Sequence, residues 1–370
     1  MMNPIKDLTL GVEEEYQIID PASRELTSYV GKFLEQGAFL FRDQLQPELL
    51  QSQIEIGTNV CQNVQQVTEE IRRLRGMVCE LARKNNKVIL AAGTHPFSQW
   101  RDQIVTDKER YHGFFDSMQI VAKRMLIFGM HVHVGIQDKD LRIDVMNQMR
   151  YFMPHILSLS TSSPFWHGDD TGFKSYRSII FEDLPRTGNP EYFDSAAEYD
   201  KYVDTLIKCG SIDEPTKIWW DIRPHPKFPT LEFRICDCTT KVKEVTAITA
   251  LIQALVAKLI QLRTANLTWR DYRTGFISEN KWRAMKDGIQ GKLIDLGKNV
   301  ETPIPQLMEE MIKFVDDVVD PLGSRKEIEY IRTIMKEGTS ADRQLMCFKE
   351  TGKMENVVDQ LVAETVDGCG

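Results

Sequence analysis

GMHVHVGI, at Gly129–Ile136, places two histidines two residues apart in an otherwise apolar segment. The alternation predicts a β-strand, because successive side chains of a strand point to opposite faces of the sheet. His131 and His133 would then share one face, with Val132 and Val134 on the other. Burying an imidazole without a polar partner costs free energy. The segment therefore predicts a sheet face on which both histidines have a partner.

Three further segments, GVEEEYQI, QSQIEIGT and TLEFRICD, show the same alternation. On one face the four predicted strands together carry Glu13, Glu15, Gln53, Glu55, His131, His133, Glu232 and Arg234. Glu14 departs from the pattern, because it falls on the apolar face of its strand. Carboxylates and imidazoles are ligand types for divalent ions. If the strands form one sheet, its polar face is a metal-lined site, and a metal or a substrate anion is the partner of the histidines.

Each motif taken alone also has a structural explanation. An isolated H-x-H in a strand is more often structural than metal-binding, and a lone E-x-E usually lies on a solvated strand face. Glu232 and Arg234 could simply pair with neighbouring strands. What favours a functional site is that all four strands place their ionisable residues on one face by the same alternation.

The remaining pattern predicts the fold class. Strands are predicted at Leu8–Asp20, Leu49–Thr58, Lys87–Thr94, Met125–Gln137, Lys217–Arg223 and Thr230–Asp237. Helices are predicted between them at Val64–Asn85, Asp107–Lys123, Leu141–Ser160 and Ala196–Cys209, and later at Lys241–Arg263, Pro303–Val319, Arg325–Lys336, Ala341–Glu350 and Met354–Val366. This order indicates an α+β fold with a helical C-terminal third. Because no long linker interrupts it, we expect a single domain over residues 1–370.

Composition excludes several classes of protein. The 370 residues are 42% hydrophobic and 27% charged, with a net charge of -8, which is typical of a soluble globular protein and argues against nucleic-acid binding. The most apolar stretch, Val245–Leu262, has polar residues near one helical stripe, so we expect a buried core helix and no membrane partner. The N-terminus lacks an apolar signal region. Seven scattered cysteines without a CxxC pair predict reduced thiols in a cytoplasmic protein.

Several arginines are candidates for anion binding, because the guanidinium fork suits carboxylate or phosphate. They are Arg177, Arg186, Arg223, Arg234 and Arg343. Any one of them could instead pair with a local acid. Two loops rich in Gly, Pro and Asp, 163–174 and 184–192, are candidate site loops. The chain has no Walker or GxGxxG motif, so metal and arginine would hold the phosphates of a bound nucleotide.

As a set, LGVEEEYQIID, IEIGT, GMHVHVGI, PHPKFPTLEFRICD and ADRQL resemble the bacterial carboxylate–amine ligases of the glutamate–cysteine ligase type 2 family. The order and spacing match over nearly the whole chain. The resemblance implies a glutamine synthetase-like fold, in which an antiparallel sheet forms a funnel with helices packed outside. It implies ATP with Mg²⁺ or Mn²⁺, amino-acid substrates, and a homo-oligomer. Such ligases activate a carboxylate, typically the γ-carboxylate of glutamate, as an acyl phosphate that an amine such as cysteine attacks. Glutamate–cysteine ligase activity is often weak in the family, so the amine acceptor stays open.

The resemblance also implies roles for individual residues. The implied metal ligands are Glu13, Glu15, Glu55, His131 and Glu232. His133 would assist as a ligand or as a phosphate contact, and Arg234 would face the transferred γ-phosphoryl group. Substrate carboxylate or phosphate would be contacted by Arg177, Arg223 and Arg343.

Two other functions share some of these features. H-x-H with acidic residues also occurs in metal-dependent hydrolases, although zinc sites favour histidine and glutamates outnumber histidines here. A protein that only binds a nucleotide or an amino acid is the second alternative. Loss of the acidic residues from one strand would indicate such a protein, and no strand of the set has lost them.

Overall fold

Antiparallel pairing brings the polar strands into one sheet. The computed structural model of the chain describes residues 8–369. The main sheet has seven strands in the order β2-β3-β1-β5-β9-β8, with β4 also paired to β1. They are β1 (Leu10–Ile19), β2 (Leu45–Pro47), β3 (Gln53–Gly57), β4 (Val88–Leu90), β5 (Gly129–Gly135), β8 (Ile222–Pro224) and β9 (Thr230–Asp237). Every pairing between them is antiparallel, so the predicted α+β fold with an antiparallel sheet is confirmed.

The register places the predicted polar residues beside one another. Glu13 lies opposite His131, and Glu15 lies opposite Glu55. His133 pairs with Glu232 on the other side of β5. Since residues paired across a ladder lie on the same face of the sheet, the parity expected from the sequence holds through four neighbouring strands.

The opposite face of the sheet is the core. Val12, Val132 and Phe233 are paired across β1, β5 and β9, and all three are buried. This face packs against α2 (Val64–Lys84), α5 (Lys139–Met149), α6 (Met153–Ser160) and α9 (Val242–Thr264). Helix α9 is long and apolar enough to cross a membrane by length and composition, but it lies mostly buried among these elements. The prediction of a core helix is confirmed.

Glu14 has its own partners within this core. Its carboxylate forms an ion pair with Arg75 of α2, and both side chains are fully buried. The Tyr16 hydroxyl donates to Glu14, and Arg75 donates further to the backbone oxygens of Thr239 and Thr240. The residue that broke the alternation therefore fixes α2 against the sheet.

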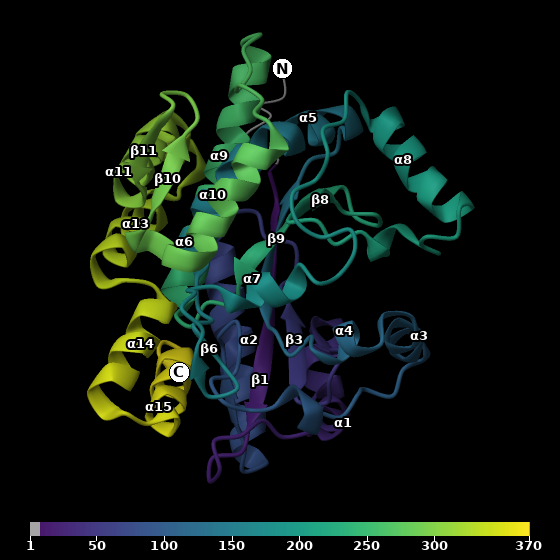
Figure 1. Cartoon of the computed structure of the whole chain (residues 1–370), viewed down its shortest axis with the longest axis vertical. Coiled ribbons are helices and arrows are strands. Elements are labelled where there is room, and N and C mark those ends of the chain that lie inside the picture. The colour runs from purple at the N-terminus through teal and green to yellow at the C-terminus, as the bar shows by residue number, and fades with distance from the viewer. Residues whose placement is uncertain (1–7, 370) are drawn as a thin grey trace.

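The other helices surround the sheet, as Figure 1 shows. They are α1 (Val30–Phe41), α3 (Glu109–Met118), α4 (Ile120–Lys123), α7 (Tyr176–Phe181), α8 (Ala196–Lys208), α10 (Thr274–Asp287), α11 (Ile304–Phe314), α12 (Asp316–Leu322), α13 (Arg325–Glu337), α14 (Ser340–Thr351) and α15 (Met354–Val366). Local side chains start several of them: Asn63 accepts from the backbone of α2, and Ser195 from that of α8.

The structure differs from the sequence expectations at several elements. The helix expected over 107–123 is broken at Gln119, which has a φ of 50°. The helix expected over 141–160 is divided by the tighter turn Arg150–Phe152. The C-terminal third also contains a hairpin of β10 (Lys292–Asp295) and β11 (Val300–Pro303), so it is not wholly helical. A second small hairpin joins β6 (Phe165–Trp166) and β7 (Asp169–Asp170).

Candidate active site

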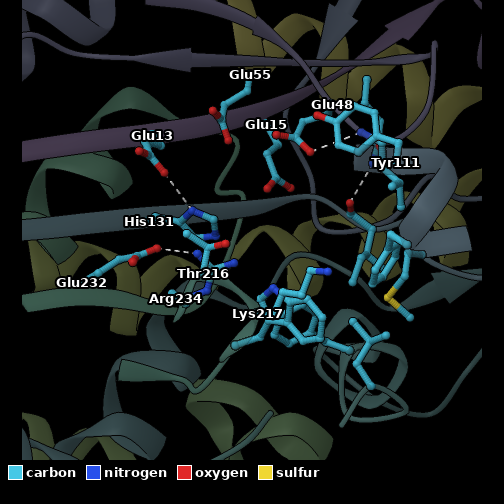
Figure 2. Close-up of a pocket in the computed structure, with 18 of the residues that line it drawn as sticks. Glu13, Glu15, Glu48, Glu55, Tyr111, His131, Thr216, Lys217, Glu232 and Arg234 are labelled. Carbon is cyan, nitrogen blue, oxygen red and sulfur yellow. Dashed lines mark hydrogen bonds and ion pairs between the residues drawn. The ribbon is translucent and has the colours of Figure 1, made fainter. Parts of the chain in front are cut away.

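A cavity of about 370 Å³ lies over the polar face of the sheet (Figure 2). Strands β1, β3, β5, β8 and β9 supply most of its polar wall. The predicted site residues that line it are Glu13, Glu15, Glu55, His131, Arg177, Arg223, Glu232 and Arg234. The site predicted from four separate segments is therefore brought together in one place.

Two groups of side chains have the spacing of metal ligands. The first consists of Glu13, Glu55 and His131, and the second of Glu13, His133 and Glu232. In each group the ligand atoms lie within 4.8 Å of one another. His131 Nδ1 is 3.0 Å from one Glu13 oxygen, and His133 Nε2 is 3.4 Å from the other. Figure 2 shows Glu13, His131 and Glu232 at one side of the cavity.

The Glu13 carboxylate is the charge shared by the two groups. Burial opposes its ionisation, but hydrogen bonds from His131 and His133 outweigh burial and hold the pKa of Glu13 well below its usual range. Burial, followed by the charge of Arg234, lowers the pKa of His131 to about 4. His131 is therefore neutral near pH 7, which is the form that ligates metals.

A cluster of carboxylates lies beside these groups. Burial raises the pKa of Glu55 well above its usual range, and the charges of Glu48, Glu13 and Glu15 add to this effect. Burial and then Glu48 raise the pKa of Glu15 to about 7. Several buried carboxylates that face one another without enough positive charge are stabilised by a bound cation. His133 Nε2 lies 3.4 Å from Glu13 Oε1 and belongs to the same cluster, and this donor set fits divalent ions.

Glu232 is held by two arginines. Arg223 Nε donates to Glu232 Oε2 at 2.7 Å, and Arg234 Nη1 forms an ion pair with the other oxygen. Burial opposes ionisation of Glu232, but the two guanidinium charges lower its pKa below the usual range. Arg234 Nε is buried and has no acceptor among the residues described. Arg234 itself is one of the residues that line the cavity.

Arg177 reaches the cavity from α7 through a close approach to β5. A Cβ on Gly129 would lie 2.4 Å from Arg177 Nη2, so a larger residue there would displace the guanidinium. Arg177 donates to the backbone oxygens of Arg234 and Ile235, at 3.3 and 3.4 Å. Its Nε is buried without a partner in the described chain.

Asp237 anchors the segment that carries Arg177. The fully buried Asp237 carboxylate accepts from the hydroxyls of Ser163 and Ser175 and from the backbone N–H of Ser162. Ser163 Oγ in turn accepts from the backbone N–H of Arg177. The first candidate site loop, 163–174, begins at this anchor, and Leu184 of the second loop lines the cavity.

Arg343 lies outside the cavity that the other predicted site residues line. Its guanidinium forms ion pairs with Glu244 of α9 and Glu364 of α15, and Nη1 also donates to the backbone oxygen of Gly338. It is not among the residues that line the cavity. The structure does not bring Arg343 together with the other predicted site residues, because the ADRQL segment opens α14 and the Arg343 side chain joins α14 to α9 and α15.

Sequence reasoning missed other residues of the cavity. Glu48 lies between β2 and β3, outside any alternating strand, so no periodic pattern marks it. Arg110, Tyr111 and Phe114 come from α3, and Trp219 precedes β8. His225, on the proline-rich connection between β8 and β9, also lines the cavity.

Comparison with known proteins agrees with this geometry. Residues 9–360 match the profile of the family described as Glutamate-cysteine ligase family 2 (GCS2). The chain belongs to this family. A relative from Roseiflexus castenholzii, named "Putative glutamate–cysteine ligase 2", is 53% identical over 366 residues, covering 99% of this chain and 97% of its own. A relative of the same name from Solibacter usitatus is 49% identical over 98% of this chain and 94% of its own.

Solved structures share the fold at low sequence identity. A glutamate–cysteine ligase from Francisella tularensis in complex with AMP has a TM-score of 0.72 at 13% identity, covering 98% of this chain and 89% of that one. A bifunctional glutathione synthetase from Pasteurella multocida has a TM-score of 0.74 at 13% identity. The match covers 99% of this chain, which spans about half (53%) of that longer enzyme.

Family membership identifies the class of reaction. The chain is an ATP-dependent carboxylate–amine ligase of the glutamate–cysteine ligase type, acting on small-molecule substrates. The expectation drawn from the sequence is confirmed at this level, and the hydrolase alternative has no support.

Proposed function

We propose that the enzyme joins the γ-carboxylate of glutamate to an amine such as that of cysteine, with ATP as phosphoryl donor. The observation that supports this most directly is the sheet register, in which carboxylates, imidazoles and Arg234 converge on one cavity. Phosphoryl transfer needs positioning and charge neutralisation more than covalent chemistry by the protein. Carboxylates for cations and arginines for anions are the groups such a site requires.

The metal ligands in this proposal are Glu13, Glu15, Glu55, His131 and Glu232, with Mg²⁺ or Mn²⁺ as the ion. His133 and Glu48 face the same ligand cluster and would complete it. Divalent ions, when bound, neutralise phosphate charge and fix the phosphate oxygens. The protein holds the ligands for them in place through the antiparallel register, before any substrate enters.

The arginines act on the reacting groups. Arg234 faces the transferred γ-phosphoryl group, and Arg177 binds phosphate or substrate carboxylate beside it. Arg223 holds Glu232 and orients it toward the cavity. A donor fixed in this way stabilises charge as it develops without having to reorganise. The γ-carboxylate attacks the γ-phosphorus of ATP and displaces ADP, and the amine then attacks the acyl carbon with loss of phosphate.

We also propose the setting in which the enzyme works. Residues 1–370 act as one catalytic domain in a cytoplasmic homo-oligomer without nucleic-acid or membrane partners. The acidic net charge and the buried position of α9 support the last two points.

The test is ADP release by the purified protein with ATP and Mg²⁺, across pairs of carboxylates and amines that include glutamate with cysteine. We expect release to require both substrates and the metal. Glu55→Gln should keep the fold and abolish release, because the change removes a ligand charge and preserves shape. Glu35→Gln, on the exposed face of α1, is the matched control. Full activity in a folded Glu55→Gln protein would contradict the assignment of this cluster.

A further inference from the structure

One side of the active-site cavity is aromatic. Tyr111 and Phe114 lie one turn apart on α3, and the Phe114 ring meets the Trp219 ring edge-on at 5.7 Å. We call Tyr111, Phe114 and Trp219 the aromatic wall. Met125 and Leu184 also line the cavity. In Figure 2, Tyr111 lies on the side away from Glu13 and Glu232.

The rings of the aromatic wall are held in fixed orientations. The Arg186 guanidinium lies 5.4 Å from the centre of the Trp219 ring. The Tyr111 hydroxyl donates to the backbone oxygen of Pro47 at 2.9 Å, and that residue is buried. A preorganised apolar surface binds a complementary group with little entropy loss on the protein's side. The wall is therefore a built binding surface that the metal and phosphate chemistry does not use.

Charged side chains of both signs lie near the aromatic wall. Glu214 lines this part of the cavity, as do Arg110 and Lys217, and Arg186 lies over the ring of Trp219. A carboxylate attracts an ammonium group. Glu214, which the metal-ligand cluster does not use, can therefore face the ammonium group of an amine substrate.

A second cavity has cationic side chains that the phosphates of a nucleotide could contact. It measures about 610 Å³, and Lys139, Arg142 and Lys227 line it together with Asp200 and Asp204. His225 lines both cavities, and its ring lies 5.4 Å from that of His133, next to Glu13. The two cavities therefore meet beside the metal ligands. A nucleotide in the second cavity would leave the aromatic wall to the amino-acid substrates.

Glutamate does not need the aromatic wall, because its recognition depends on two carboxylates and an ammonium group. The thiol of cysteine is small and covers little of three aromatic rings. We infer that the amine acceptor carries an aromatic or large aliphatic group that packs against Tyr111, Phe114 and Trp219. This inference rests on the proposed function.

The acceptor nitrogen forms a C–N bond to the acyl carbon, the C–O bond to phosphate breaks, and phosphate leaves with the electron pair. The nitrogen loses two protons as the ammonium group becomes an amide N–H, one to the departing phosphate and one to solvent.

The expected preference for a large acceptor side chain follows from its contact with the aromatic wall. One methylene group in a hydrophobic pocket changes kcat/KM by about 10- to 200-fold. Leucine and phenylalanine differ from alanine by more than one such group. We therefore expect at least about a 10-fold higher kcat/KM for leucine or phenylalanine than for alanine, and a similar advantage over cysteine.

The experiment measures ADP release with ATP, Mg²⁺ and glutamate, and with alanine, cysteine, leucine or phenylalanine as acceptor. Trp219→Ala should reduce the phenylalanine-to-alanine ratio about 10-fold and leave the KM for ATP unchanged. Phe114→Leu provides a second variant with a milder change in packing. Phe276→Ala, at an exposed position on α10 outside the cavity, is the control.

Each outcome has a distinct meaning. Equal or better use of cysteine and alanine by the wild-type enzyme would overturn this inference and leave the proposed function standing. An increase in the KM for ATP in Trp219→Ala, with the acceptor ratio intact, would show that the wall binds the nucleotide base instead. No release with any acceptor would overturn the proposed function, and this inference with it.

Discussion

Gly129→Ala tests whether the position of the Arg177 guanidinium matters for turnover. The new Cβ would lie 2.4 Å from Arg177 Nη2, 3.1 Å from Cζ and 3.2 Å from Nε. Ordinary contacts between such atoms are about 3.5 Å. The guanidinium must therefore move by about 1 Å. Its bonds to the backbone oxygens of Arg234 and Ile235, already 3.3 and 3.4 Å long, would break.

The displacement should reduce catalysis more than stability. A shift of about 1 Å in a positioned group can cost about 100-fold in rate. Overpacking in a well-packed region costs about 1–3 kcal/mol. We therefore expect kcat to fall about 100-fold while the protein still folds. Arg177→Lys should behave similarly, because an ammonium group cannot reproduce the guanidinium fork.

The assay is steady-state ADP release, with urea denaturation to measure the free energy of unfolding. Gly275→Ala on α10 is the matched control, since its Cβ would meet nothing within 4 Å. Wild-type kcat and KM in folded Gly129→Ala protein would refute the reasoning. That result would mean that Arg177 either moves without consequence or takes no part in the reaction.

Three further predictions concern stability and the residues outside the cavity. Glu14→Gln leaves Arg75 charged and unpaired in the core, so urea denaturation should show a loss of about 3–5 kcal/mol; a loss under 1 kcal/mol would contradict the account of this ion pair. Burial lowers the pKa of His95 to about 3, whereas the unfolded chain titrates near 6.5. Below about pH 6.5 the unfolded state binds the extra proton, so stability should fall by about 2 kcal/mol from pH 7 to pH 5. His95→Asn should remove that part of the slope, and an unchanged slope would exclude His95 as its source. Arg343→Ala should destabilise the fold by about 2 kcal/mol, through loss of its ion pairs, and leave the KM for ATP unchanged. A large increase in the KM for ATP would show that Arg343 takes part in nucleotide binding.

The two-residue alternation in the sequence was sufficient to predict the strands that carry the site. The parity of Glu13, Glu55, His131 and Glu232 depends only on the two-residue period of a strand, so it could be predicted from the sequence. Their convergence depended on pairing between distant strands, which periodicity does not encode; there the family resemblance supplied what the pattern lacked.

Other parts of the structure had no local signal. Glu48 reaches the cavity from a connection, where no periodicity relates it to Glu55. Helix α1 contains two glycines, which lower helix propensity, and the pattern did not reveal it. Arg343 sits in a motif shared with the family, but its partners on α9 and α15 are distant in sequence and could not be foreseen.

The three consecutive glutamates of β1 show how little freedom this strand has in length. Glu13 and Glu15 face the cavity, and Glu14 faces Arg75 in the core. Deleting or inserting one residue before them would exchange the two faces, because a slip of one position reverses every side chain of a strand. The core would then receive two carboxylates, and the ligand cluster would keep one. A single-residue insertion or deletion there would therefore remove folding and activity together.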